Sequence, residues 1–259
     1  MDDPGLFAEA VLLFAALAAG WVDAVVGGGG LIQLPALLLG LPGAAPAQVL
    51  ATNKIASIAG TTTSAVTYHR LVHPDLRTAA PMAGFALAGA AAGAASASLL
   101  PEARFRPLVL VALVLVAVRT AVSRDLGQQR RPREGQRHRV IAVLFGAAIG
   151  FYDGIFGPGT GAFLVFALVG LLGYTFVEAS ATARIVNAAT NLGALLVFIP
   201  QGAPLWRLGL AMALANLVGA YLGARMAVAR GSGFIRGVFL VVVGVLVLRL
   251  GWDVVRELG

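Results

Sequence analysis

The chain has 259 residues, of which 59% are hydrophobic and only 12% are charged. An ordinary soluble domain has about 25% charged residues, so this composition excludes one and favours a protein that faces lipid. The net charge of +7 comes almost entirely from arginines in short loops, which indicates membrane topology and not a nucleic-acid-binding surface. The sequence contains no cysteine, which excludes disulfides, thiol catalysis and cysteine-ligated metals.

Ten apolar segments follow one another along the chain, and most approach the roughly 20 residues with which a helix crosses a bilayer. They cover residues 6–26, 30–41, 48–67, 78–100, 105–122, 139–156, 161–173, 178–199, 204–229 and 234–252. The acidic first ten residues lack the positive charge of a cleaved signal peptide, so we expect segment 6–26 to be permanent. Segments 30–41 and 161–173 are short, and each follows a glycine cluster.

A polar, basic stretch at 123–139 divides the chain into two halves that match each other. When the first half is shifted by 130 residues, Asp23 falls on Asp153 and Lys54 on Arg184, and no gap is needed from Gly20 to Ile55. We therefore predict an all-α polytopic membrane protein with two repeats, residues 1–122 and 140–259, joined by a cytoplasmic linker at 123–139.

The arginines predict the orientation of these repeats. Five segments per half is an odd number, so a cytoplasmic linker places both termini in the periplasm and inverts the halves relative to each other. Eleven arginines then lie in loops on the inside and five in loops on the outside, as the positive-inside rule requires. The orientation is the same if each short segment is half of a re-entrant hairpin, and the sequence leaves that choice open.

The glycine clusters at 27–30 and 157–161 are expected to interrupt helices at membrane depth, where irregular backbone must be buried in protein or line a cavity. Freed amide groups and the start of the next helix would attract an anion. Close helix packing is the alternative, and we expect it for Gly89, Gly93, Gly219 and Gly223. Because the two clusters occupy equivalent positions, we favour binding by Gly28, Gly29, Gly30, Gly159, Thr160 and Gly161.

Four charged residues lie within apolar segments: Asp23, Lys54, Asp153 and Arg184. A charge at this depth costs several kcal/mol, so each is expected to face a cavity or an oppositely charged partner. Three interpretations stay open. The four residues form structural ion pairs, or Lys54 or Arg184 lies near a helix end and extends its charge to the membrane surface. In the third, Lys54 and Arg184 attract an anion while Asp23 or Asp153 takes up a proton.

Polar residues follow helical spacing on segment 48–67 and on its counterpart 178–199. They predict a pathway wall with binding residues Asn53, Thr61, Asn187 and Asn191, and interhelical hydrogen bonding is the alternative. Gln33 is a further candidate, and its counterpart is Phe163, so the site is not symmetric. The histidines, His138 among them, lie in predicted cytoplasmic loops without metal-ligand spacing, and we predict no metal, cofactor or catalytic residue.

Two motifs resemble those of the sulfite exporter TauE/SafE family of membrane transporters. The first is G-x-x-D-x-x-x-G-G-G-G from Gly20, followed by A-T-N-K; the second is G-F-Y-D-G-I-F-G-P-G-T-G from Gly150, followed by A-S-A-T-A-R-I-V-N. The resemblance covers nearly the whole chain. It implies transport of small sulfur-containing anions, such as sulfite or organosulfonates, across a bacterial inner membrane, with export more typical than import.

The predicted function is therefore a secondary transporter that works by alternating access on a small anion, in a lipid bilayer and without a nucleic-acid partner. The alternatives are a cation transporter that uses Asp23 and Asp153 as ligands, a passive anion channel, and a membrane enzyme or assembly factor, for which the sequence shows no nucleophile–base set or metal cluster. The substrate, the coupling ion and the formation of a homo-oligomer stay open.

Overall fold

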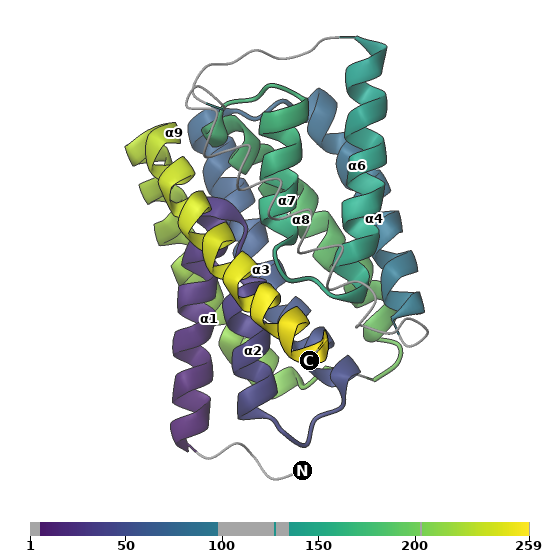
Figure 1. The fold of residues 1–259 in the computed structure, drawn as a ribbon, viewed down its shortest axis with the longest axis vertical. Helices are drawn as coiled ribbons and strands as arrows, with labels where there is room; N and C mark the ends of the chain where they lie inside the picture. Colours follow the sequence, from purple (N-terminus) through teal and green to yellow (C-terminus); the bar gives the residue numbers. More distant parts are fainter. Residues whose placement is uncertain (1–5, 98–126, 128–134, 203, 259) are drawn as a thin grey trace.

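The computed structural model describes residues 6–97, 127, 135–202 and 204–258, and the regular elements among these residues are all helices (Figure 1). The elements are α1 (Leu6–Val26), α2 (Gly30–Gly40), α3 (Pro46–Val72), α4 (Leu76–Ser96), α6 (Gln136–Ile155), α7 (Thr160–Phe166), the π-helical turn Ala167–Leu171, α8 (Phe176–Phe198) and α9 (Trp206–Leu258). Helix α9 consists of two helices that meet at Gly231, whose φ is 73°. The predicted segment 105–122 and most of the linker lie outside the described residues.

Each half begins with a long helix that is followed by a short helix running back along it. In the first half, a methyl group on Gly40, at the end of α2, would lie 3.1 Å from the side chain of Leu12, near the start of α1. In the second half, Tyr174 follows α7 and contacts His138 in the first turn of α6, with ring centroids 5.9 Å apart. Both short segments are therefore the returning arms of hairpins.

Five of the described helices are long and apolar enough to cross a membrane: α1, α4, α6, α8 and the Trp206–Val245 part of α9. Helix α3 has 27 residues and carries the polar stripe predicted from the sequence. Large apolar side chains such as Phe14, Leu144 and Leu214 are exposed on the outer faces, as expected of helices that contact lipid. The fold is that of a polytopic membrane protein.

Glycines bring helices of the two halves into direct backbone contact. A methyl group on Gly219 of α9 would lie 1.9 Å from the carbonyl oxygen of Leu17 in α1. The equivalent contact joins Gly89 of α4 to the carbonyl oxygen of Ala147 in α6, at 2.3 Å. Gly223 and Gly93 repeat this pattern one turn later, so the close-packing role predicted for these four glycines is confirmed. The first helix of each half thus packs on a late helix of the other half.

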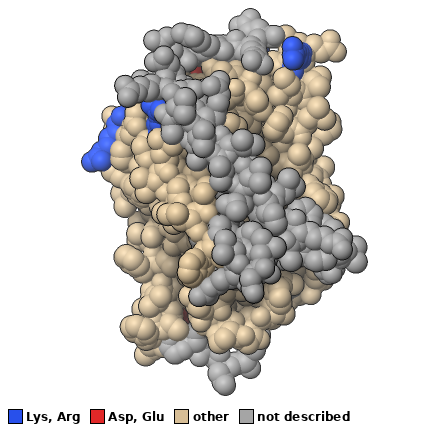
Figure 2. Space-filling view, in the orientation of Figure 1, with Lys and Arg blue, Asp and Glu red and all other residues tan. Residues whose placement is uncertain are grey.

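The start of α1 and the end of α9 lie at the same end of the molecule (Figure 1). Figure 2 shows the Lys and Arg side chains of the described residues on this face at the opposite end, with uncharged residues between the two ends. That end holds the α3–α4 loop and the start of α6, which carries Arg137 and Arg139.

A polar cluster joins the two halves at this basic end. The Tyr174 hydroxyl donates to Asp75 Oδ2 at 2.9 Å, and Thr78 Oγ1 donates to the same oxygen at 2.9 Å. His138 Nε2 lies 3.0 Å from Thr78 Oγ1. The sequence placed His138 in a loop, and this was wrong: α6 begins before the apolar run, and its polar first turn buries His138 against the neighbouring half.

Asp75 is expected to make this contact pH-sensitive. Burial raises its pKa, but hydrogen bonds from Tyr174, Thr78 and the Arg77 and Thr78 backbone amides outweigh it, and the pKa is lowered from 3.8. A carboxylate with a depressed pKa stabilises the fold above its unfolded pKa, and the stabilisation is lost as the pH falls through the folded value. We expect the apparent Tm in detergent to fall below about pH 4, and to fall less in Asp75→Asn. If the apparent Tm fell equally with pH in the wild type and in Asp75→Asn, the result would contradict this role.

Candidate functional site

The glycine clusters at 27–30 and 157–161 interrupt the helices, and these two glycine breaks cross each other inside the protein. The Ala162 amide, just after the second break, donates to the Gly27 carbonyl oxygen at 3.1 Å. A methyl group on Gly27 would lie 2.1 Å from the Gly161 carbonyl carbon, and one on Gly161 would lie 2.4 Å from the Gly27 Cα. Because the hairpins enter from opposite ends of the molecule, this contact, here called the glycine crossing, joins them at their tips (Figure 1).

An ion pair between Lys54 and Asp153 lies beside the glycine crossing. Lys54 Nζ lies 2.6 Å from Asp153 Oδ2, and the two side chains are 2% and 3% exposed. The other carboxylate oxygen, Oδ1, accepts a hydrogen bond from Thr160 Oγ1 at 2.7 Å. A methyl group on Gly157 would lie 3.4 Å from Lys54 Nζ, so the pair contacts the second break directly.

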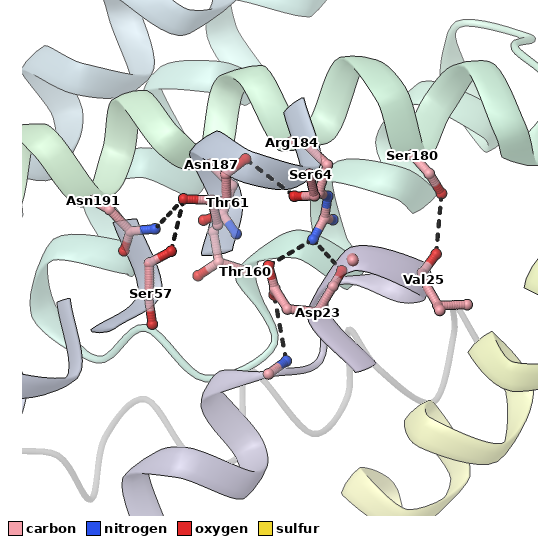
Figure 3. Close-up of polar contacts among 12 residues, drawn as sticks. Asp23, Val25, Ser57, Thr61, Ser64, Thr160, Ser180, Arg184, Asn187 and Asn191 are labelled. Carbon is pink, nitrogen blue, oxygen red and sulfur yellow. Dashed lines mark hydrogen bonds and ion pairs between the residues drawn. The ribbon is translucent and has the colours of Figure 1, made fainter. Parts of the chain in front are cut away.

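A second ion pair joins Arg184 to Asp23 (Figure 3). Arg184 Nη1 lies 2.8 Å from Asp23 Oδ2 and also donates to the Asp23 main-chain carbonyl oxygen. Asp23 Oδ1 accepts from the Gly29 amide at 3.4 Å. The Asp23 side chain is 15% exposed, whereas that of Arg184 is fully buried.

The two ion pairs are exchanged between the halves. Asp23 and Lys54 belong to the first half but bind Arg184 and Asp153 of the second. Each aspartate also uses its other oxygen to hold a residue of its own glycine break, Gly29 or Thr160. The ion pairs that the sequence left open are thus present, and they tie both breaks to the opposite half. Removing one member of such a buried pair leaves an uncompensated charge and is strongly destabilising.

A buried amide cluster lies between α2, α3 and α9. Gln33 Nε2 donates to Asn53 Oδ1 at 2.9 Å, and Asn216 Nδ2 donates to Gln33 Oε1 at 2.8 Å. Asn216 is 3% exposed, and a methyl group on Gly60 would collide with its side chain. The sequence analysis missed Asn216. The available signal was a lone amide inside the apolar segment 204–229, and its counterpart in the first half is Ala86.

The polar faces of α3 and α8 meet at Thr61 and Asn191, which are equivalent positions of the two halves. Asn191 Nδ2 donates to Thr61 Oγ1 at 3.4 Å, and Thr61 Oγ1 donates to the Ser57 carbonyl oxygen at 2.8 Å (Figure 3). Asn187 Oδ1 accepts from Thr190 Oγ1 at 3.2 Å. The structure therefore brings the predicted stripes together, with Asn53 turned towards Gln33.

Several amides of the breaks are already used within the protein. The Gly29 amide binds Asp23, and the Thr160 amide donates to the Gly157 carbonyl oxygen at 3.4 Å. Gly28, Gly159 and Gly161 are buried, and Gly30 lies against Pro158, which a methyl group on Gly30 would approach to 3.4 Å. The predicted residues of the two breaks thus lie at or beside the glycine crossing and the ion pairs, and Gln33 and Asn53 lie in the amide cluster. The other three, Thr61, Asn187 and Asn191, lie where α3 meets α8.

Comparison with known proteins places the chain among transporters. The family described as Sulfite exporter TauE/SafE matches residues 12–250. A probable membrane transporter protein, ORF9, from Sinorhizobium is 36% identical over 96% of this chain and 95% of its own length. The probable membrane transporter protein YfcA of Escherichia coli is 31% identical over 94% of this chain and 89% of its own length.

A probable membrane transporter protein of Haemophilus influenzae is 31% identical over 97% of both chains. No solved structure matches the chain. The family and these relatives are membrane transporters and not enzymes. The all-helical fold, its membrane-spanning helices and the match over nearly the whole length agree, and the chain belongs to the TauE/SafE family of membrane transporters.

Proposed function

We propose that this protein is a secondary transporter of small sulfur-containing anions, such as sulfite or organosulfonates, and that it exports them by alternating access. It would work in the bacterial inner membrane, with both termini in the periplasm and the basic end in the cytoplasm. The Lys and Arg side chains visible on the face in Figure 2 lie at the end opposite the start of α1, which supports this orientation. The substrate class and the direction follow the family description.

The observation that carries the proposal is the pair of exchanged ion pairs at the glycine crossing. Lys54 and Arg184 are buried cations, and each is neutralised by a carboxylate, Asp153 or Asp23. A small oxyanion has the same chemistry as these carboxylates, so it can compete for the two cations. Because each pair joins opposite halves, the exchange of a carboxylate for a substrate would loosen one contact between the halves, as alternating access requires.

The aspartates supply a means of coupling. A carboxylate that takes up a proton releases its cation, and the cation then needs another anion. Asp153 would keep Thr160 as a partner after protonation, because the hydroxyl can also accept a hydrogen bond. Proton uptake and anion binding would therefore favour each other. The amides at Gln33, Asn53, Asn187 and Asn191 and the hydroxyl of Thr61 would supply hydrogen bonds along the pathway, and Gly28, Gly30 and Gly159 would supply backbone contacts.

Flux into proteoliposomes tests this function. We expect sulfite or a small sulfonate to show saturable flux that is reduced at least about tenfold when both Lys54 and Arg184 are replaced by methionine, because each charge interaction is worth more than about 1.4 kcal/mol. The double variant Asp23→Asn/Asp153→Asn should retain anion binding. Arg139→Lys, at the exposed start of α6, is the matched control and should transport normally.

The alternatives give different results in the same assay. A cation transporter would lose binding in the double aspartate variant and keep it in the double methionine variant. A passive channel would show flux that does not saturate and does not respond to a proton gradient. Flux of sulfite, thiosulfate, sulfoacetate, taurine and small carboxylates at background in the wild type would reject the proposal.

A further inference from the structure

We propose that the Nε–Nη2 edge of Arg184 is the oxyanion-binding element of this site, and that it selects anions with two oxygens on one atom. The proposal rests on the anion transport proposed above and deepens it. It assigns recognition to one side chain and gives the two ion pairs different tasks.

Two of the three side-chain nitrogens of Arg184 have no hydrogen-bond acceptor among the described residues. Its Nη1 binds both the carboxylate and the main-chain carbonyl oxygen of Asp23. Its Nε and Nη2 have no hydrogen-bond partner among the described residues, although the side chain is fully buried. Buried donors without an acceptor are rare in proteins because their desolvation is not compensated. These two groups form one edge of the planar guanidinium, and such an edge matches two oxygens of a carboxylate, sulfite or sulfonate.

The free edge lies against the glycine crossing. A methyl group on Gly161 would approach Arg184 Nη2 to 2.7 Å, and the same group would lie 2.4 Å from the Gly27 Cα. Glycine at 161 therefore leaves the edge uncovered by any side chain of its own break. Separation of Gly27 from Gly161 would open the edge to a solute.

The Lys54–Asp153 pair differs from this arrangement. Lys54 Nζ binds Asp153 Oδ2 at 2.6 Å, and Thr160 occupies the other carboxylate oxygen. Among the described residues, neither Lys54 nor Asp153 has a buried side-chain atom without a partner. An ammonium is also a point charge that does not distinguish two-oxygen anions from monatomic ones. Lys54 therefore supplies charge and holds the halves together, and Arg184 supplies selectivity.

Binding of methanesulfonate and bromide to purified protein in detergent tests the assignment. Both are monovalent, but only methanesulfonate presents several oxygens on one atom. We expect the wild type to bind methanesulfonate at least about tenfold more tightly than bromide, a bidentate contact being worth roughly one decade or more. Arg184→Lys keeps the positive charge but removes the two neighbouring N–H donors of the guanidinium edge, so this variant should lose the preference for methanesulfonate. Arg139→Lys should leave both affinities unchanged.

Asp23→Asn provides a second readout that does not need an altered arginine. Asparagine can still accept from Nη1, but the negative charge beside the edge is gone, so methanesulfonate should bind several-fold more tightly. Weaker binding in Asp23→Asn, or an unchanged preference in Arg184→Lys, would overturn the assignment while leaving anion transport intact. Failure of the wild type to bind or transport any of these anions would instead reject the function on which the assignment rests.

Discussion

Replacing Gly27 with alanine is expected to abolish the fold or to destabilise it by more than about 4 kcal/mol. Gly27 has φ 86°, a conformation in which an L side chain costs about 1–2 kcal/mol. The added methyl group would also lie 2.1–2.4 Å from three backbone atoms of Gly161 and Ala162, which cannot move aside as a flexible side chain does. The yield of monodisperse protein and the apparent Tm at a fixed scan rate measure the effect.

Gly84→Ala is the matched control for this substitution. Gly84 lies in α4, and a methyl group there would have no neighbouring atom within 4 Å, so alanine should be neutral or should stabilise the helix by up to about 1 kcal/mol. Equal behaviour of the Gly27 and Gly84 variants would mean that the two breaks do not touch in the protein.

Breaking the Lys54–Asp153 pair from one side is expected to cost about 3–5 kcal/mol. Lys54→Met leaves the Asp153 carboxylate buried without its cation, and Asp153→Asn does the same to the ammonium; both side chains are at most 3% exposed. The double variant should cost clearly less than the sum of the two, by about 1–3 kcal/mol, because it leaves no uncompensated charge. Equilibrium unfolding in mixed SDS micelles gives the three values.

Arg137→Ala is the control for that cycle, since Arg137 is exposed at the start of α6 and should change stability by less than about 0.5 kcal/mol. Strict additivity of the Lys54 and Asp153 substitutions would show that the two side chains do not interact. The same cycle on Asp23 and Arg184 should give a smaller coupling, because Asp23 is 15% exposed.

The local features of the fold could be predicted from the sequence. The segments 6–26 and 30–41 coincide with α1 and α2 almost to the residue, because the glycine cluster that begins at Gly27 both interrupts the apolar run and ends α1. Hairpins were one of two open alternatives for the short segments. A chain read in order cannot distinguish a helix that continues across a membrane from one that turns back.

The partners of the charged residues could not be predicted from spacing. Asp23 and Lys54 lie in the same half, and nothing in their order indicates that each binds the other half. Asn216 was missed for the same reason, since a single amide in an apolar helix becomes informative only when Gln33 is seen beside it. The candidate residues were recognisable by type, whereas their pairing depends on how α3 and α8 pack on the two hairpins.

The exchanged ion pairs also constrain biogenesis. Asp23 and Lys54 are synthesised before either of their partners, so the first half enters the membrane carrying a buried acid and a buried base whose final counterions do not yet exist. Native pairing has to wait until α6 and α8 have been inserted. Docking of the halves is therefore expected to be a late step of assembly, and the first half made alone would carry both charges without their final partners.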